Sequence, residues 1–169
     1  VDENRETDVE LSILVVGYNH SDLTKYCVES IQKYTTLPYE LILIDNGSSD
    51  DTWEFYQSLD NVKIIRLKNN VGLLFAIHLA VTSGVMKGRF WAYLNNDAFV
   101  TKDWDKILLD CIRPDPRIAI AMPVTDNHAP CFTIEVPFKT VPMLKKLHIH
   151  STQEQYLQAR KENIEKMRQ

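Results

Sequence analysis

Glycine is scarce in this chain, and the glycine-rich motifs that hold nucleotides in many α/β proteins are missing. The 169 residues include five glycines, and none belongs to a Gly-x-Gly-x-x-Gly or a Gly-x-x-x-x-Gly-Lys-Ser/Thr sequence. Those motifs supply the backbone N–H groups that cradle a dinucleotide or a triphosphate. The Gly-x-Ser-x-Gly turn of many hydrolases is also missing. The sequence therefore argues against all of these sites.

Cysteine is rare and positive charge is in deficit. Three dispersed cysteines form no Cys-x-x-Cys pair, which favours reduced, mostly buried thiols over a disulfide framework. Nineteen Lys and Arg against 23 Asp and Glu give a net charge of -4, so there is no basic face for a nucleic acid. The N-terminus is polar, and no apolar run approaches the ~18 residues of a membrane span. We expect a cytoplasmic protein that binds no nucleic acid. Peripheral association with the inner face of a membrane is compatible with this expectation.

Short apolar runs alternate with helical patterns along most of the chain. The helical patterns begin near Ser21, Asp50, Leu73 and Trp104, with Ser21 and Asp22 capping the first helix. The first run, at Leu11–Val16, is continuous rather than alternating, which is typical of a strand buried on both faces of a parallel sheet. We predict strands at Leu11–Val16, Leu41–Ile44, Val62–Leu67, Phe90–Leu94 and Ile118–Met122. The fold class is therefore α/β, with a mostly parallel central sheet and helices on both faces.

The chain divides into three parts by its composition. Residues 1–10 form a polar lead-in, and residues 11–127 hold the α/β core. Residues 128–169 form an irregular segment, with a short strand at Cys131–Val136, and then a charged helix that begins at a capping box from Ser151.

Polar side chains follow three of the predicted strands where each strand ends. Tyr18-Asn19 follows the first strand, Asp45-Asn46 the second, and Asn95-Asn96-Asp97 the fourth. Ligands of parallel α/β sheets bind outside the carboxyl ends of the strands, so we expect these clusters to share one site. Taken singly, each cluster has a simpler explanation, because Asx residues make turns and a tyrosine at a strand end packs with its hydroxyl in water.

A carboxylate after a buried strand can coordinate a hard cation that bridges two phosphates. Asp97 has this position. An acidic protein that binds a doubly charged diphosphate needs such local help, and the cation would act as a Lewis acid on a leaving diphosphate.

Four segments in register resemble glycosyltransferase family 2: Ser12–Asn19, Leu43–Thr52, Asn69–Gly72 and Leu94–Asp97. The resemblance covers residues 11–127. It implies a GT-A (Rossmann-like) fold and an inverting transfer from a nucleoside-diphosphate sugar to an acceptor, in bacterial polysaccharide or glycoconjugate synthesis.

The resemblance also implies roles for individual residues. Tyr18 would lie against the base, and Asp45 and Asn46 would contact base and ribose. Asn70 and Gly72 would line the nucleotide pocket. The tripeptide Asn95-Asn96-Asp97 stands where the family has its Asp-x-Asp motif, with Asp97 as the ligand of Mn²⁺ or Mg²⁺.

Two departures from the family pattern bear on function. Asn95 replaces the first acidic residue of the metal motif. No residue after Asp97 matches the family's catalytic-base motif; Glu135 and Glu154 are poor candidates, so no catalytic residue is assigned.

We expect the chain to stop where the half that binds a carbohydrate, lipid-linked or protein acceptor begins, which would leave an open side capable of self-association. Two interpretations stay open: a metal-dependent glycosyltransferase, and a non-catalytic or truncated nucleotide-sugar-binding module.

Overall fold

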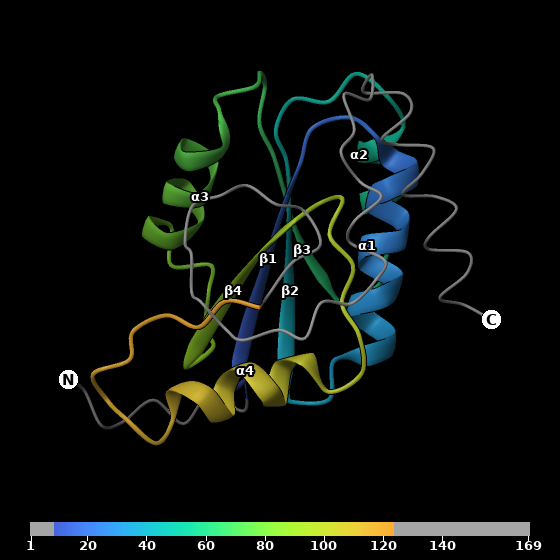
Figure 1. The fold of residues 1–169 in the computed structure, drawn as a ribbon. Helices are drawn as coiled ribbons and strands as arrows, with labels where there is room; N and C mark the ends of the chain where they lie inside the picture. Colours follow the sequence, from blue (N-terminus) through green and yellow to red (C-terminus); the bar gives the residue numbers. More distant parts are fainter. Residues whose placement is uncertain (1–8, 124–169) are drawn as a thin grey trace, which may run out of the picture. The chain divides into compact units, whose positions relative to one another are not determined.

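The computed structural model describes residues 9–123, and the statements below concern these residues. The expected strand at Cys131–Val136, the C-terminal helix, Glu135 and Glu154 lie outside them. Strands and helices alternate along the chain (Figure 1). Their bounds are β1 Leu11–Gly17, α1 Ser21–Tyr34, β2 Tyr39–Asp45, α2 Thr52–Gln57, β3 Val62–Arg66, α3 Leu73–Thr82, β4 Phe90–Asn95 and α4 Trp104–Ile112.

The four strands form one parallel sheet in the order β3-β2-β1-β4. Every residue of β1 is buried, as expected for a central strand whose sequence is apolar apart from Ser12. In the sheet register Gly17 lies opposite Asp45, and Val16 lies opposite Asn95. The carboxyl ends of β1, β2 and β4 are therefore level with one another.

Each face of the sheet has its own apolar core. Ile13 and Val15 of β1 pack with side chains of α1 and α2, while Leu14 and Val16 pack with Ala76 and Ala80 of α3. Figure 1 shows α1 and α2 on one side of the strands and α3 on the other. The prediction of a parallel sheet with helices on both faces is confirmed.

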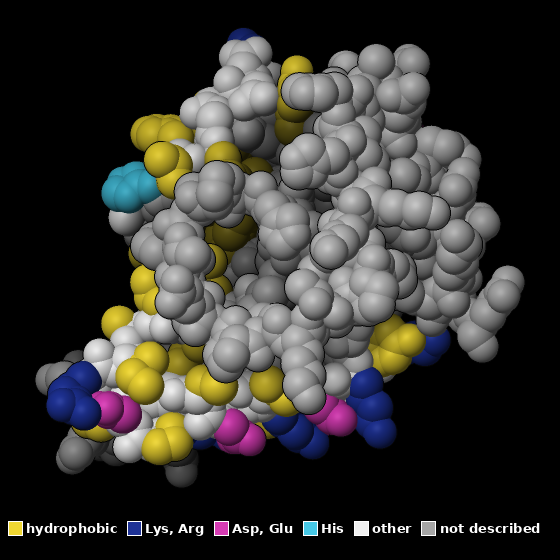
Figure 2. All heavy atoms as spheres, in the orientation of Figure 1, with side chains coloured by type: hydrophobic (Ala, Val, Ile, Leu, Met, Phe, Trp, Pro, Cys, Tyr) yellow, Lys and Arg dark blue, Asp and Glu magenta, His cyan; other side chains and the backbone are white. Residues whose placement is uncertain are grey.

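Helix α3 carries no charged side chain and rests on the sheet through small residues. Ala76 and Ala80 are fully buried, whereas Leu74 and Phe75 are 82% and 53% exposed. Figure 2 shows hydrophobic side chains gathered over this helix. No helix within residues 9–123 has the length and apolarity to cross a membrane.

The predicted fifth strand at Ile118–Met122 is wrong. These residues form no strand, and Ile120 and Met122 are 76% and 70% exposed. The Ile118 N–H donates to the carbonyl of Asp115 and closes a turn, instead of pairing with a neighbouring strand. Ile118 and Ile120 supply β-propensity, but a strand also needs a neighbouring strand to pair with.

The predicted cap of α1 is also wrong. Ser21 is the first helical residue, and His20 before it caps nothing with its side chain. Asp50 acts instead: its Oδ2 accepts from Ser21 N–H at 3.0 Å, and its Oδ1 accepts from Thr52 N–H at 3.1 Å. Burial raises the pKa of Asp50, but the hydrogen bonds from Thr52 and Ser21 outweigh it and hold the pKa below its usual value. One carboxylate thus joins the first turns of α1 and α2.

Asp105 ties α4 to the loop between α1 and β2. Its side chain is buried, and Oδ2 accepts from the backbone N–H groups of Thr36 and Leu37 at 2.7 and 2.8 Å. Burial raises the pKa of Asp105, but the N–H groups of Leu37 and Thr36 favour the carboxylate more strongly, so the net pKa is lowered.

We expect Asp105→Asn to lower the free energy of unfolding by about 1–3 kcal/mol, because the N–H groups of Thr36 and Leu37 both lose a charged acceptor. Asp110→Asn, on the exposed side of the same helix, is the matched control and should change it by less than about 0.5 kcal/mol. Urea unfolding measures both. The pKa of Asp105 is lower when folded, so its contribution is present above the ordinary value of 3.8 and is lost as the pH falls below it. A wild-type advantage over Asp105→Asn that does not shrink as the pH is lowered below 3.8 would contradict this account.

Candidate functional site

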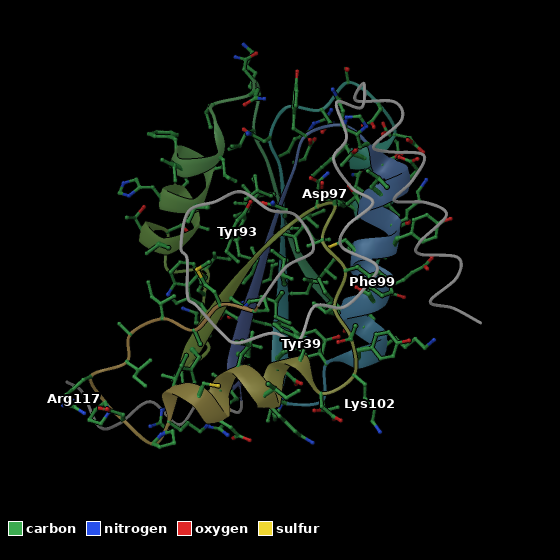
Figure 3. All side chains as sticks on the ribbon, in the orientation of Figure 1. Tyr39, Tyr93, Asp97, Phe99, Lys102 and Arg117 are labelled. Carbon is green, nitrogen blue, oxygen red and sulfur yellow. The ribbon has the colours of Figure 1, made fainter. Side chains whose placement is uncertain are left out.

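The loops that follow the parallel strands meet at the carboxyl edge of the sheet. Tyr18 follows β1, Asn46 follows β2, and Asp97 follows β4. In Figure 3 Asp97 lies toward this end, whereas Tyr39, the first residue of β2, lies toward the other. The prediction that Tyr18, Asp45 and Asp97 converge at one edge is confirmed.

Asn19 connects the loops that follow β1, β2 and β4 through hydrogen bonds. Its backbone N–H donates to Ser48 Oγ at 2.9 Å, and its Oδ1 accepts from Ser49 N–H at 2.8 Å. Its carbonyl accepts from Asn96 Nδ2 at 3.2 Å. Asn19 has φ +58°, a left-handed conformation that asparagine tolerates better than most residues. The sequence showed Asn19 only as the neighbour of Tyr18 and gave it no role.

Asn46 and Asn70, two of the predicted site residues, bond directly. Asn46 Nδ2 donates to Asn70 Oδ1 at 3.1 Å, and Asn46 Oδ1 accepts from Val71 N–H at 3.0 Å. Asn70 Oδ1 also accepts from Gly72 N–H at 2.9 Å. Asn46 is 3% exposed, while Asn70 and Gly72 are exposed. Asn46 therefore orders the 69–72 loop from below, and the loop faces solvent.

Gly47 allows this loop to approach. Its φ is +80°, and a Cβ at this position would lie 2.6 Å from the carbonyl carbon of Asn69. Any other residue would have to push the 69–72 loop away and would also adopt an unfavourable backbone conformation.

Asp45 is enclosed beneath the edge. Its side chain has no exposed surface, and Oδ1 accepts from Ser48 N–H at 2.8 Å. Its Oδ2 lies 3.4 Å from Arg66 Nε, close enough for ionic attraction, although no hydrogen bond of normal geometry reaches this oxygen. The Arg66 guanidinium lies over the Trp53 ring, 4.9 Å from its centroid. Arg66 and Trp53 were not predicted, and the only sequence signal was a cation at the end of the third strand.

The end of β4 supplies a carboxylate and an exposed amide. Tyr93 donates its hydroxyl proton to Asn95 Oδ1, and Asn95 is exposed. Burial and the negative charge of Asp97 raise the pKa of Tyr93 to about 12, so its hydroxyl stays protonated at neutral pH. Asn96 is turned inward, with Nδ2 2.9 Å from Thr24 Oγ1.

Within residues 9–123, no three His, Cys, Asp or Glu side chains gather into a metal cage. Mg²⁺ is commonly held by one or two carboxylates, with phosphate oxygens and water completing the shell. Asp97, half-buried at the edge, fits that kind of site. A cation here would be shared between the protein and a phosphorylated ligand.

The edge is thus built in two tiers. The lower tier consists of Asp45 and Asn46, which are buried and hydrogen-bond to the loops. The upper tier reaches solvent and consists of Tyr18, which is 48% exposed, with Asn70, Gly72, Asn95 and Asp97. An aromatic ring and amides are suited to a ligand with a flat ring and hydroxyl groups, and a carboxylate can hold a cation that binds anionic oxygens.

Comparison with known sequences gives a family match over most of the chain. The sequence model of glycosyl transferase family 2 matches residues 12–158. A UDP-Glc:alpha-D-GlcNAc-diphosphoundecaprenol beta-1,3-glucosyltransferase of Escherichia coli, WfaP, is 34% identical over 91 residues, which are 53% of this chain and 36% of that protein. The chondroitin synthase of Escherichia coli is 31% identical over 121 residues, 69% of this chain and 17% of that protein. The chain therefore spans well under half the length of either relative.

Solved structures share the fold. The crystal structure of Staphylococcus aureus TarS 1-349 superimposes with a TM-score of 0.54 at 22% identity, over 63% of this chain and 33% of that one. The TarS 1-349 complex with UDP-GlcNAc gives a TM-score of 0.55 at 22% identity, over 63% of this chain and 32% of that one. These likenesses identify the α/β sheet as a GT-A fold. With the family match covering residues 12–158 and the fold in agreement, the chain belongs to glycosyl transferase family 2.

Proposed function

We propose that this chain is the donor-binding part of a glycosyltransferase that takes its sugar from a nucleoside-diphosphate sugar. The observation that carries the proposal is the convergence of the loops after β1, β2, β3 and β4 at one sheet edge, in a chain of this family. The relative WfaP is named for a UDP-sugar donor, and TarS was solved with UDP-GlcNAc. A uridine donor is therefore our first choice.

The upper tier of the edge provides the contacts of the donor. The exposed ring of Tyr18 offers a face to the base, and Asn70 with Gly72 forms the loop that lines the nucleotide pocket. Asp45 and Asn46 lie under these groups. Most of the hydrogen-bonding atoms of Asp45 and Asn46 already bond the loops. The predicted contacts of these two residues with base and ribose would therefore have to use the atoms that remain.

Asp97 is the residue that would hold Mn²⁺ or Mg²⁺ together with the donor's diphosphate. The ion, when bound, would stabilise the negative charge that develops on the leaving diphosphate. Asn95, in place of the first acid of the metal motif, presents an amide whose oxygen already accepts from Tyr93. Asp97 is therefore the residue of this motif that supplies a negatively charged ligand for the cation.

In the transfer reaction an acceptor hydroxyl loses its proton to a general base and attacks the anomeric carbon opposite the diphosphate. No side chain of residues 9–123 is assigned as that base, so the donor half alone accounts for binding and not for proton removal. The acceptor is a carbohydrate, lipid-linked or protein hydroxyl, and a lipid-linked acceptor would bring the enzyme to the inner face of a membrane. A non-catalytic nucleotide-sugar-binding module is the second candidate, favoured by this same lack of a base.

Isothermal titration of UDP-, GDP- and dTDP-sugars in the presence of Mn²⁺ tests the function. We expect a uridine donor to bind with a Kd between about 1 μM and 1 mM, the range of typical enzyme substrates. A radiolabelled-donor assay on the same protein should show transfer far below ~1 s⁻¹, because missing base catalysis costs ~10²–10⁴-fold. Absence of binding for all three donors would contradict the proposed function, and turnover near ~1 s⁻¹ would contradict the claim that the base is lacking.

Asp97→Asn tests the metal role. With Mn²⁺ present we expect the Kd for UDP to rise about 10-fold or more, as the protein's anionic ligand is lost, whereas in EDTA the variant and the wild type should bind alike. Asp110→Asn on the exposed face of α4 removes the same charge away from the loops and should behave as wild type in both buffers. If Asp97→Asn weakens binding equally with Mn²⁺ and with EDTA, Asp97 is not a metal ligand.

A further inference from the structure

A carboxylate buried under the nucleotide loops needs a counter-charge. Asp45 is fully buried at the end of β2, and its Oδ2 accepts no hydrogen bond of normal geometry. An ionised carboxylate in such a place is strongly destabilising unless an opposite charge lies close by. The cation in contact with it is Arg66, whose Nε lies 3.4 Å from Oδ2.

Arg66 is held in place by the fold itself. As the last residue of β3 it lies opposite Asp45 in the sheet register. Its guanidinium lies over the ring of Trp53 in α2, with Cζ 4.9 Å from the ring centroid. A planar, permanently charged guanidinium suits this position, because it can lie on an aromatic face while facing a carboxylate with its edge.

The turn that Asp45 begins controls both nucleotide loops. Asp45 Oδ1 accepts from Ser48 N–H, and Ser48 Oγ in turn accepts from the N–H of Asn19, beside Tyr18. Asn46, the next residue, bonds Asn70 and Val71. A shift of the 45–48 turn would therefore move the β1–α1 loop and the 69–72 loop together.

We propose that Arg66 is a positioning residue for nucleotide binding, which acts by neutralising Asp45 and so fixing the 45–48 turn. The proposal rests on the proposed function for its link to the nucleotide, but the positioning effect itself does not require a ligand. The proposal also predicts that a second substitution, at Asp45, restores the loop order and the nucleotide affinity that Arg66→Met loses. If the only need is to balance the charge of Asp45, then removing that charge with Asp45→Asn, which keeps an acceptor for Ser48 N–H, should compensate.

The experiment compares Arg66→Met, Arg66→Lys, Asp45→Asn/Arg66→Met and the control Arg113→Met, in which the lost arginine pairs with Glu10 and Asp110 instead. Amide hydrogen exchange at Ser48, Val71 and Gly72 reports the loops without ligand. Titration with UDP and Mn²⁺, at a temperature where circular dichroism shows every variant folded, reports binding. The second readout is insensitive to a merely structural role, because a lower melting temperature leaves the Kd of the folded protein unchanged.

For Arg66→Met we expect exchange at the three amides to accelerate about tenfold and the Kd for UDP to rise about tenfold. Arg66→Lys should recover part of both, and Asp45→Asn/Arg66→Met should return both to within about threefold of wild type. Arg113→Met should change neither.

Two results would overturn the proposal. Unchanged amide exchange in Arg66→Met would show that the turn does not depend on Arg66. A Kd that stays weak in Asp45→Asn/Arg66→Met although amide exchange has returned to the wild-type rate would show that the ligand needs the Arg66 or Asp45 side chain itself, and not only the turn that the pair holds. If the wild type binds no nucleotide, the proposed function fails, while the exchange measurement still decides whether Arg66 positions the loops.

Discussion

The parallel pairing of β1 with β2 and with β4 is the constraint on which the rest of the site depends. It sets Gly17 opposite Asp45 and Val16 opposite Asn95, so the chain leaves three strands at one level. The pairing is stable because β1 is apolar at every position except Ser12 and Gly17 and is buried by α1 and α2 on one face and α3 on the other. Each fully buried aliphatic side chain contributes about 1.5–3 kcal/mol relative to exposure. The positions of the polar loops are thus fixed by a core that contains none of them.

Above that core, polar groups divide into those that hold the loops and those that face solvent. Asn19 and Asn46 are bonded to neighbouring loops and Asp45 to Ser48 of its own turn. Leaving a buried donor such as the Ser48 N–H without its acceptor would cost about 1–3 kcal/mol. Tyr18 and the 69–72 loop are consequently displayed in a defined arrangement without being buried. In these terms the family's motif segments combine a scaffold with a solvent-facing surface, and membership of a motif alone does not tell the two apart.

Sequence predicted the elements whose signal is local. Short apolar runs located β1 to β4, and the helix predicted at Trp104–Ile112, before two prolines, is α4 as observed. The run at Ile118–Met122 has the same local signal but lacks a pairing partner, so its prediction failed. The contacts of Asp50 with Ser21 and of Arg66 with Asp45 join residues far apart in the chain or on neighbouring strands, and no periodicity reveals them. The register of the sheet is what brings them together.

The central claim is that the carboxyl edge of this sheet binds a nucleotide sugar. Titration of ¹⁵N-labelled protein with a UDP-sugar and diamagnetic Mg²⁺, followed by two-dimensional NMR, tests it most directly. The account predicts progressive shifts for the backbone amides of Tyr18, Asn70, Gly72 and Asp97, with those of Thr36 and Leu37 at the opposite end unchanged. Shifts that leave the four edge amides untouched, or that gather around α4, would contradict it.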